Sequence, residues 1–222
     1  MGAGPGGSEW RERLRAGAQT IGVTDLTTEQ VDRLAHYAGL LMAWARVFNL
    51  TGLRDADGVL SHHVLDCLAI VPAIDRWAAG RPLRILDVGS GAGLPGVVLA
   101  VVRPGWRICT VDAVAKKVAF VRQAAGELGL GNAIAVHGRV EDVPPGDGGF
   151  DLVVSRAFAD LADFVSKTAR HLAVGGVWLA MKGQRPQPEI DALPADCEVF
   201  HVEQLAVPGL DAARCLVWIR PH

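Results

Sequence analysis

A cluster of glycines that follows Asp87 offers the clearest chemistry in this 222-residue chain. Glycines stand at positions 89, 91, 93 and 96, directly after the apolar residues Ile85, Leu86 and Val88. Glycine accepts positive φ and lets a ligand approach the backbone, because no Cβ intervenes. A strand that turns into a helix at this point would present free backbone N–H groups to a ligand. The segment therefore predicts a nucleotide-binding loop, and a strand-to-helix turn without a ligand is the alternative.

Two carboxylates bear on the kind of cofactor. Residues 91–96 match the dinucleotide fingerprint G-x-G-x-x-G, with Pro95 at the first position of the predicted helix. Asp112 ends the next apolar run, at the spacing of roughly 20 residues where a carboxylate binds ribose hydroxyls. Asp87 would repel a pyrophosphate, whereas it suits the sulfonium and ammonium groups of S-adenosylmethionine. The pattern favours S-adenosylmethionine over NAD.

Composition sets outer limits on the protein class. The chain is 50% hydrophobic and 21% charged with a net charge of −2, which argues neither for nor against a nucleic-acid partner. Its four cysteines, at positions 67, 109, 197 and 215, form no C-x-x-C pair, so we expect buried, reduced thiols. We see no signal peptide and no apolar run of about 18 residues, and expect a cytoplasmic protein without a membrane span.

Hydrophobic spacing divides the chain into two parts. Residues 1–7 are expected to be disordered, and helices are expected over 8–18, over 31–45 after a capping box formed by Thr27 and Gln30, and over 60–71, ending before Pro72. The Gly80-Arg81-Pro82 segment serves as a linker. We therefore predict a helical extension over residues 1–80 and a sheet domain over residues 81–222.

The second part alternates between strands and helices. We expect strands near 83–88, 106–111, 133–137, 150–155 and 174–181, and helices near 95–103, 114–128 and 159–172. Two extended runs, 198–205 and 213–220, joined by a turn at Pro208-Gly209, predict a terminal hairpin. The fold class is thus α/β, with a Rossmann-like, mostly parallel sheet of seven strands that ends in an antiparallel hairpin. This is the pattern of class I methyltransferases.

Polar residues follow the ends of three predicted strands, where ligands bind in doubly wound sheets. Val140 and Glu141 can contact the adenine of the cofactor. The alternative is that Glu141 is an acidic residue at the N-terminus of a helix, where it interacts with the helix dipole. Arg156 can contact the cofactor or a phosphate, or be a surface arginine. Lys182 can hold a phosphate, or be a solvated strand end. An amino-methylating enzyme would carry a Pro-Pro-aromatic motif near Arg156 and a cytosine-C5 enzyme a nucleophilic cysteine; neither is present there, so no covalent nucleophile is expected.

The extension and the surface hold further candidates. His63 and Asp66 are spaced to share a helix face, for catalysis or for a local structural hydrogen bond, whereas we expect His62 at the surface. No metal site is expected, because further ligands at suitable spacing are missing. Six basic residues can line one surface that binds RNA; the alternative is that they are ordinary solvated charges. They are Lys116, Lys117, Arg122, Arg156, Lys182 and Arg185.

Several motifs in order resemble the ribosomal small-subunit methyltransferase G family, also called glucose-inhibited division protein B. They are Ala43-Trp44, Asn49-Leu50-Thr51, His63-x-x-Asp66, the glycine loop, Arg139-Val140-Glu141, Ser155-Arg156-Ala157-Phe158 and Lys182-Gly183-Gln184. The resemblance covers about residues 25 to 220. Ser90 and Ala92 vary within the loop, and His62 replaces a common arginine, which would weaken one RNA contact.

The resemblance implies methylation of guanine N7 in 16S ribosomal RNA near the decoding centre of the small subunit. We expect a monomer, although the residues themselves do not indicate the oligomeric state. The resemblance also implies that some of these residues contact S-adenosylmethionine. Together with the analysis of the glycine loop, this predicts the following cofactor-binding residues: Asp87, Gly89, Gly91, Gly93, Leu94, Asp112, Val140, Glu141 and Arg156. The catalytic residues stay open, with His63, Asp66, Arg156 and Lys182 as candidates. Three other functions remain: an NAD(P) oxidoreductase, a methyltransferase for small molecules or proteins, and an RNA-binding protein without activity.

Overall fold

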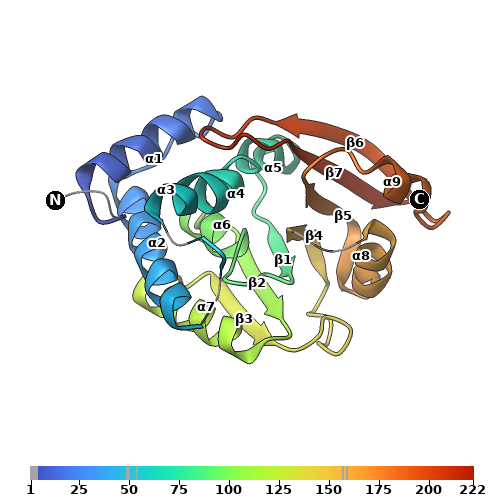
Figure 1. Ribbon diagram of the computed structural model, residues 1–222. Coiled ribbons are helices and arrows are strands. Elements are labelled where there is room, and N and C mark those ends of the chain that lie inside the picture. Colours follow the sequence, from blue (N-terminus) through green and yellow to red (C-terminus); the bar gives the residue numbers. More distant parts are fainter. Residues whose placement is uncertain (1–4, 49–50, 54, 157, 159) are drawn as a thin grey trace.

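The computed structural model describes residues 5–48, 51–53, 55–156, 158 and 160–222. Helices come first, followed by strands and helices in alternation (Figure 1). The helical elements are α1 (Ser8–Thr20), α2 (Thr28–Phe48), α3 (Ala56–Val59), the π-helical turn η1 (Leu60–Leu65), α4 (Asp66–Leu68), α5 (Val71–Ala78), α6 (Gly96–Val102), α7 (Ala115–Glu127), α8 (Leu161–Thr168), the 3-10 turn η2 (Ala169–His171) and α9 (Gln187–Asp191). The strands are β1 (Arg84–Val88), β2 (Arg107–Asp112), β3 (Ala133–His137), β4 (Phe150–Arg156), β5 (Leu172–Lys182), β6 (Cys197–Leu205) and β7 (Arg214–Pro221).

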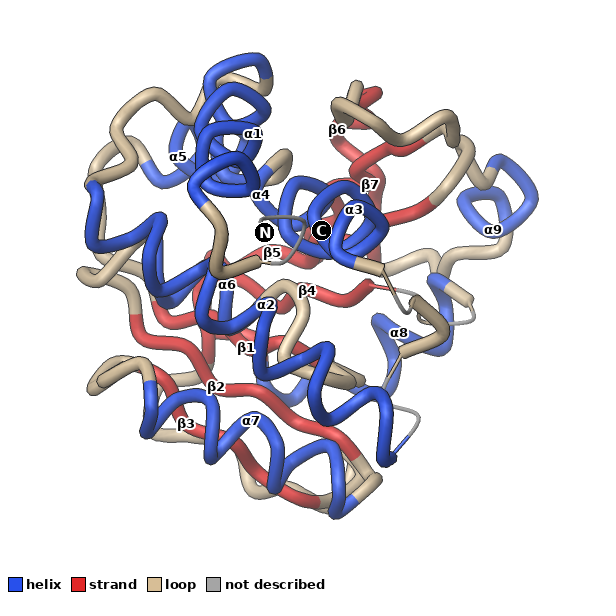
Figure 2. Tube along the Cα trace, turned by 60° about the vertical axis from the view of Figure 1, so that its left-hand side comes forward, coloured by secondary structure: helices blue, strands red, loops and turns tan. Residues whose placement is uncertain are grey.

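The strands form one seven-stranded sheet in the order β3-β2-β1-β4-β5-β7-β6, which Figure 2 traces as a continuous layer. The first five strands in this order run parallel, and β7 pairs antiparallel with both β5 and β6. The predicted fold class, including the terminal hairpin, is confirmed. The sheet order places β1 and β4 side by side near its centre, with the glycine loop after β1 and Arg156 at the end of β4.

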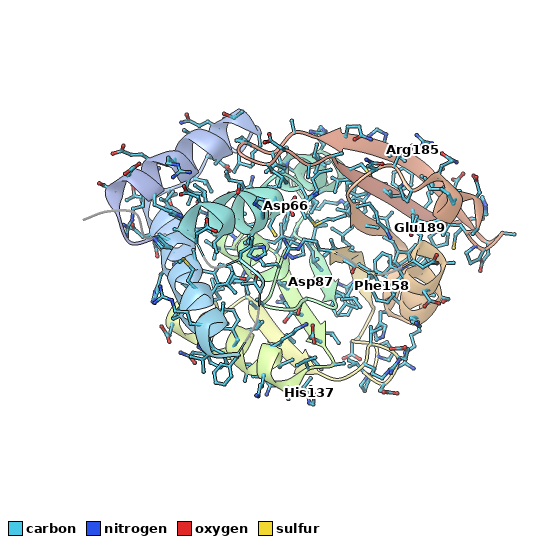
Figure 3. The ribbon with its side chains drawn as sticks, viewed as in Figure 1. Asp66, Asp87, His137, Phe158, Arg185 and Glu189 are labelled. Atoms are coloured by element: carbon cyan, nitrogen blue, oxygen red, sulfur yellow. The ribbon has the colours of Figure 1, made fainter. Side chains whose placement is uncertain are left out.

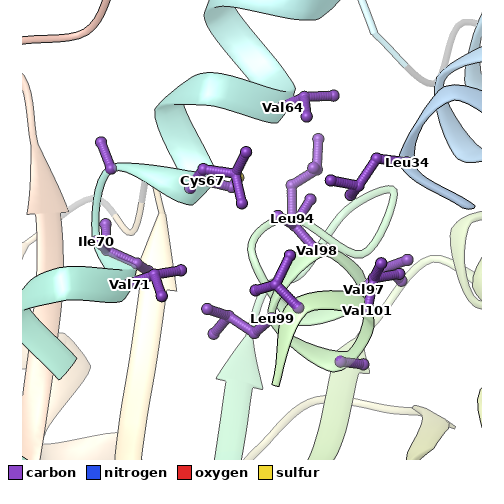
Figure 4. Close-up of a cluster of buried hydrophobic side chains, with 14 of the residues drawn as sticks. Leu34, Val64, Cys67, Ile70, Val71, Leu94, Val97, Val98, Leu99 and Val101 are labelled. Atoms are coloured by element: carbon purple, nitrogen blue, oxygen red, sulfur yellow. The ribbon is translucent and has the colours of Figure 1, made fainter. Parts of the chain in front are cut away.

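Apolar side chains cover both faces of the sheet. Along β1, Ile85 belongs to a core shared with α2, α6 and the preceding helices, whereas Leu86 points to the opposite core beside α8. Every residue of α6 is buried, because this helix lies between the sheet and the helical extension (Figure 4). The extension and the sheet therefore share one core, and the predicted boundary at residue 80 stays a prediction.

Local signals account for most element ends. Thr27 and Gln30 form the predicted capping box, with backbone-to-side-chain distances of 3.0 and 3.1 Å. The Gln30 amide also donates to the Val101 and Val102 carbonyls, which ties α2 to the end of α6. The prediction for residues 159–172 is wrong at its ends: the Asp160 carboxylate caps the N–H groups that start α8 at Leu161, and β5 begins directly after a short 3-10 turn.

Two other expectations need correction. Pro95 precedes α6 instead of occupying its first position, because the helix starts at Gly96. The stretch Ala56–Ala78 is long and apolar enough to cross a membrane by length and composition, which the sequence analysis overlooked because the stretch contains polar residues. Of its most apolar window, 72% is buried inside the protein, so this stretch is a core element. Cys67, Cys109 and Cys215 are free and buried as predicted, whereas Cys197 is half-buried.

Candidate functional site

Two cavities meet at Gly89, at the carboxyl ends of the parallel strands. The larger, about 580 Å³, lies between the glycine loop, the ends of β4 and β5, and the extension. The smaller, about 340 Å³, lies between the ends of β1 and β2 and the segment that follows β3. Together they form a cleft that can hold an extended ligand with two chemically different ends.

The glycine loop opens toward this cleft. Gly89 and Gly91 have φ of +65° and +59°, and a Cβ added at either would meet no atom within 4 Å. Both residues line the larger cavity, as do Ala92 and Leu94. Gly93 serves packing instead, because an added Cβ would lie 2.5 Å from Val97. The loop thus has the free space that a cofactor such as S-adenosylmethionine requires.

Asp112 holds the loop in this shape. Its carboxylate accepts hydrogen bonds from the N–H groups of Gly91 and Val114, both at 2.8 Å. The side chain is almost buried, and Lys117 approaches it to 3.9 Å. Each carboxylate oxygen retains a second lone pair, and Asp112 lines the smaller cavity. A ribose hydroxyl can therefore still donate to it.

Asp87 points away from the cleft and into the protein. One carboxylate oxygen accepts from the N–H of Gly96 at 2.8 Å, and the other has no partner among the described residues. Burial raises the pKa of this carboxyl group to about 7. The expectation that the first N–H of the helix faces a ligand is wrong, because Asp87 binds it. Asp87 lines neither cavity, so its predicted contact with the cofactor stays a prediction.

Val140 and Glu141 line the smaller cavity, as predicted for residues that follow β3. The Val140 carbonyl accepts from His171 at 2.9 Å, which fixes the backbone here. Its own backbone N–H, and then Arg139, lower the pKa of the Glu141 carboxyl group, so Glu141 is ionised near neutral pH. A carboxylate and a fixed backbone at this end suit the donor groups of an adenine or a ribose.

Asp66 is the best-shielded charge in the larger cavity, with 2% exposure. Arg156 lies 3.3 Å from one carboxylate oxygen, and Arg214 donates to the other at 2.8 Å. Figure 3 labels Asp66 on the helices of the extension. Two arginines on one carboxylate leave an excess positive charge, which suits an anionic group of a ligand. With both of its oxygens engaged in this way, Asp66 is a poor general base.

His63 shares the cavity with Asp66, as their spacing predicted. Its Nε2 lies 2.7 Å from the Thr51 hydroxyl, and its Nδ1 lies 3.4 Å from Arg156. Burial, followed by the charge of Arg156, lowers the pKa of His63 to about 4, so the ring is neutral at pH 7. His62 also lines the cavity and is half-buried, which corrects its predicted place at the surface.

The predicted basic residues fall into separate groups. Lys116, Lys117 and Arg122 lie on α7, where Lys116 is 5.2 Å from the ring centroid of Phe48. Arg185 lies near α9, in a part of the molecule away from α7 (Figures 1 and 3).

Lys182 lines the larger cavity but is 2.7 Å from the Glu189 carboxylate, so its charge is compensated. A single basic rim formed by these residues, and their contacts with RNA, remain predictions.

Sequence reasoning missed Arg214 and gave Thr51 no role. Arg214 is 148 residues from Asp66 in sequence, and no local motif marks it. Thr51 stands in the Asn49-Leu50-Thr51 motif, of which the first two residues, like Ala157, lie outside the described residues. Among the described residues, no group of three or more His, Cys, Asp or Glu side chains can hold a metal ion.

Comparisons with known proteins agree with this geometry. The model of the GidB family, rRNA small subunit methyltransferase G, matches residues 30–217. The chain is 55% identical over 212 residues to "Ribosomal RNA small subunit methyltransferase G" of Leptothrix cholodnii, covering 96% of each chain.

Solved structures share the fold. TrmN from Thermus thermophilus has a TM-score of 0.57 at 20% identity, with 73% of this chain and 53% of that chain covered. A ribosomal protein L11 methylase from Lactobacillus delbrueckii has a TM-score of 0.54 at 18% identity, with 69% and 77% covered.

Proposed function

The chain belongs to the rRNA small subunit methyltransferase G family, and we propose that it transfers a methyl group from S-adenosylmethionine to guanine N7 in 16S ribosomal RNA. The match extends over nearly the whole chain, including the extension that forms one wall of the cleft. Its substrate is the small ribosomal subunit or its RNA, and it works in the cytoplasm as a monomer.

The two cavities of the cleft suit different parts of the cofactor. We assign the adenosine end of the cofactor to the smaller cavity, with the ribose on Asp112 and the adenine beside Val140 and Glu141. The methionine end extends over Gly89 into the larger cavity, where Arg156 can pair with its carboxylate. When bound there, S-adenosylmethionine supplies an electrophilic methyl group on a sulfonium.

The carrying observation is that the described residues of the larger cavity offer no strong base at neutral pH. Asp66 is bound by two arginines, and His63, although unprotonated, is a weak base because burial lowers its pKa to about 4. Guanine N7 has a lone pair and no proton, so its methylation requires none to be removed. The protein has only to align the acceptor and exclude water. An amine or hydroxyl acceptor would fit this cavity less well, since it must lose a proton.

The test is transfer of labelled methyl groups to small subunits from cells that lack this protein, followed by nucleoside mass spectrometry. We expect one 7-methylguanosine in the 16S RNA. Asp112→Asn should weaken S-adenosylmethionine binding about tenfold, because it loses charge at the ribose and loop contacts. Asp142→Asn, an exposed carboxylate nearby, should leave binding unchanged. Methyl transfer to protein or small molecules alone would refute the proposal, as would tight binding of NAD(P) in place of S-adenosylmethionine.

A further inference from the structure

Apolar side chains are exposed where α2 ends and α7 begins. Five large hydrophobic side chains are exposed among the described residues, and three of them belong to these two helix ends: Val47, Phe48 and Val114. The two helices lie side by side (Figure 2), with the ring centroids of Trp44 on α2 and Phe120 on α7 5.4 Å apart. Exposed apolar groups that gather in one place indicate an interaction surface.

The ring of Phe48 is held in place and is still open to solvent. Its centroid lies 5.0 Å from that of Trp44, with the two ring planes at 47°. The ammonium group of Lys116 lies 5.2 Å from the same centroid. Phe48 nevertheless keeps 41% of its surface exposed. A fixed aromatic ring with free surface is a site on which another flat ring can stack.

The charges on these two segments are all positive. Residues 40–48 and 114–122 contain no acidic side chain, although the whole chain has a net charge of −2. Their four basic side chains are Arg46, Lys116, Lys117 and Arg122. A single nucleic-acid strand is the partner that such a surface fits, because its bases stack on aromatic rings while its phosphates pair with cations.

This surface lies beside both cavities of the cleft. Phe48 stands three residues before Thr51, which lines the larger cavity, and Lys116 stands three residues after Ala113, which lines the smaller one. Three residues of chain span at most about 11 Å. A strand that places one base in the larger cavity therefore has its neighbouring nucleotide within reach of Phe48 and Lys116.

We propose that Phe48 and Lys116 bind the RNA strand beside the target guanine, with one neighbouring base stacked on Phe48 and a phosphate paired with Lys116. The proposal rests on the proposed methylation of 16S RNA. A base that enters an enzyme cavity has to leave its stack, which costs free energy. The neighbouring base thereby loses a stacking partner, and the ring of Phe48 takes that place. Phe48 and Lys116 are thus substrate-binding residues and take no part in the methyl transfer itself.

The experiment measures the Kd of the full-length protein for small subunits from cells that lack it, with S-adenosylhomocysteine present so that no methyl group is transferred. Phe48→Ala should raise this Kd about tenfold, which is the scale of base–aromatic stacking. Phe48→Tyr keeps the aromatic ring and should keep the wild-type Kd. Phe48→Leu keeps an apolar side chain without an aromatic face and should resemble Phe48→Ala. The affinity for S-adenosylmethionine should be unchanged in all three variants.

Lys116→Gln tests the phosphate contact. It should lower the slope of log Kd against log salt concentration by about 0.7, the value for one phosphate of a single strand. Two controls lie at the amino ends of their strands, away from the cleft at the carboxyl ends. Val174→Ala, on an exposed apolar residue of β5, should leave the Kd unchanged. Arg107→Gln, on an exposed cation at the start of β2, should leave the salt slope unchanged.

The outcomes separate this proposal from the proposed function. A wild-type Kd in Phe48→Ala or in Phe48→Leu would overturn the stacking contact, and a wild-type salt slope in Lys116→Gln would overturn the phosphate contact. If Phe48→Ala loses affinity for S-adenosylmethionine through misfolding, the comparison of Phe48→Tyr with Phe48→Leu decides in its place. A wild type that adds no 7-methylguanosine to the subunits would overturn the proposed function and, with it, the target that the proposal assumes.

Discussion

Asp87 allows a quantitative test, because the fold buries its carboxyl group at a helix start with one hydrogen bond. One oxygen accepts from Gly96 and the other has no partner among the described residues. Burial raises the pKa of the carboxyl group from 3.8 to about 7, although the Gly96 N–H opposes this shift. The perturbation is Asp87→Asn, which keeps the shape and the accepted hydrogen bond but removes the titration.

The direction of the pH dependence of stability follows from the number of protons that Asp87 binds in the folded and in the unfolded state. Between pH 4 and pH 7 the folded state holds a proton on Asp87 that the unfolded state has lost, so the free energy of unfolding falls as pH rises. The penalty is absent below the unfolded pKa and complete above the folded one. Each pKa unit corresponds to about 1.4 kcal/mol. Between pH 5 and pH 8 the wild type should lose about 3 kcal/mol relative to Asp87→Asn, most of it below pH 7.

The assay is urea unfolding of both proteins at pH 5, 6, 7 and 8 without cofactor. The difference between the two free energies of unfolding should grow with pH and level off above pH 7. A constant cost of burying the new amide shifts all four points equally and leaves this slope intact. Asp191→Asn, on an exposed carboxylate of α9, is the control and should give a difference that does not change with pH. A flat difference for Asp87→Asn would refute the reasoning.

Two shorter predictions concern packing and charge. Gly96→Ala should lower the free energy of unfolding by about 1–3 kcal/mol in denaturant titrations, because its Cβ would lie 2.6 Å from Thr110 Cγ2. Arg214→Ala should lower it by about 2 kcal/mol, since Asp66 is buried and loses a charged hydrogen bond. Arg220→Ala, on the same strand but in an exposed pair, should cost less than about 1 kcal/mol; equal costs for the two arginine variants would contradict the role given to the burial of Asp66.

The sequence predicted what depends on neighbouring residues. The capping box of Thr27 and Gln30, the glycine loop and the alternation of strands and helices are set by local spacing, and all appear in the structure. The direction of Asp87 was not predictable in this way, because a carboxylate at a strand end can point to either side of the following loop. Its side chain turns inward where Gly96, nine residues later, offers an N–H at the helix start.

The arrangement around Asp66 was beyond local reasoning for another cause. Its two arginines stand 90 and 148 residues away, on β4 and β7. Only the sheet order, which sets β5 between those strands, brings both to the same cavity. The end of β4 and the start of the antiparallel β7 thus lie at the same edge of the sheet and contribute to one site. Composition and periodicity do not predict this arrangement.

The π-helical turn η1 lies where the extension forms the wall of the cleft. At the regular 100° per residue, His62, His63 and Asp66 would lie at about 0°, 100° and 40° around the helix axis, so helical spacing alone gathers them on one face. All three side chains line the larger cavity, and the wider turn over Leu60–Leu65 contains the two histidines. Such turns are rare in helices and occur frequently at functional sites. The position of this turn beside the cavity therefore supports the proposal that the extension forms a wall of the cleft that holds cofactor and substrate.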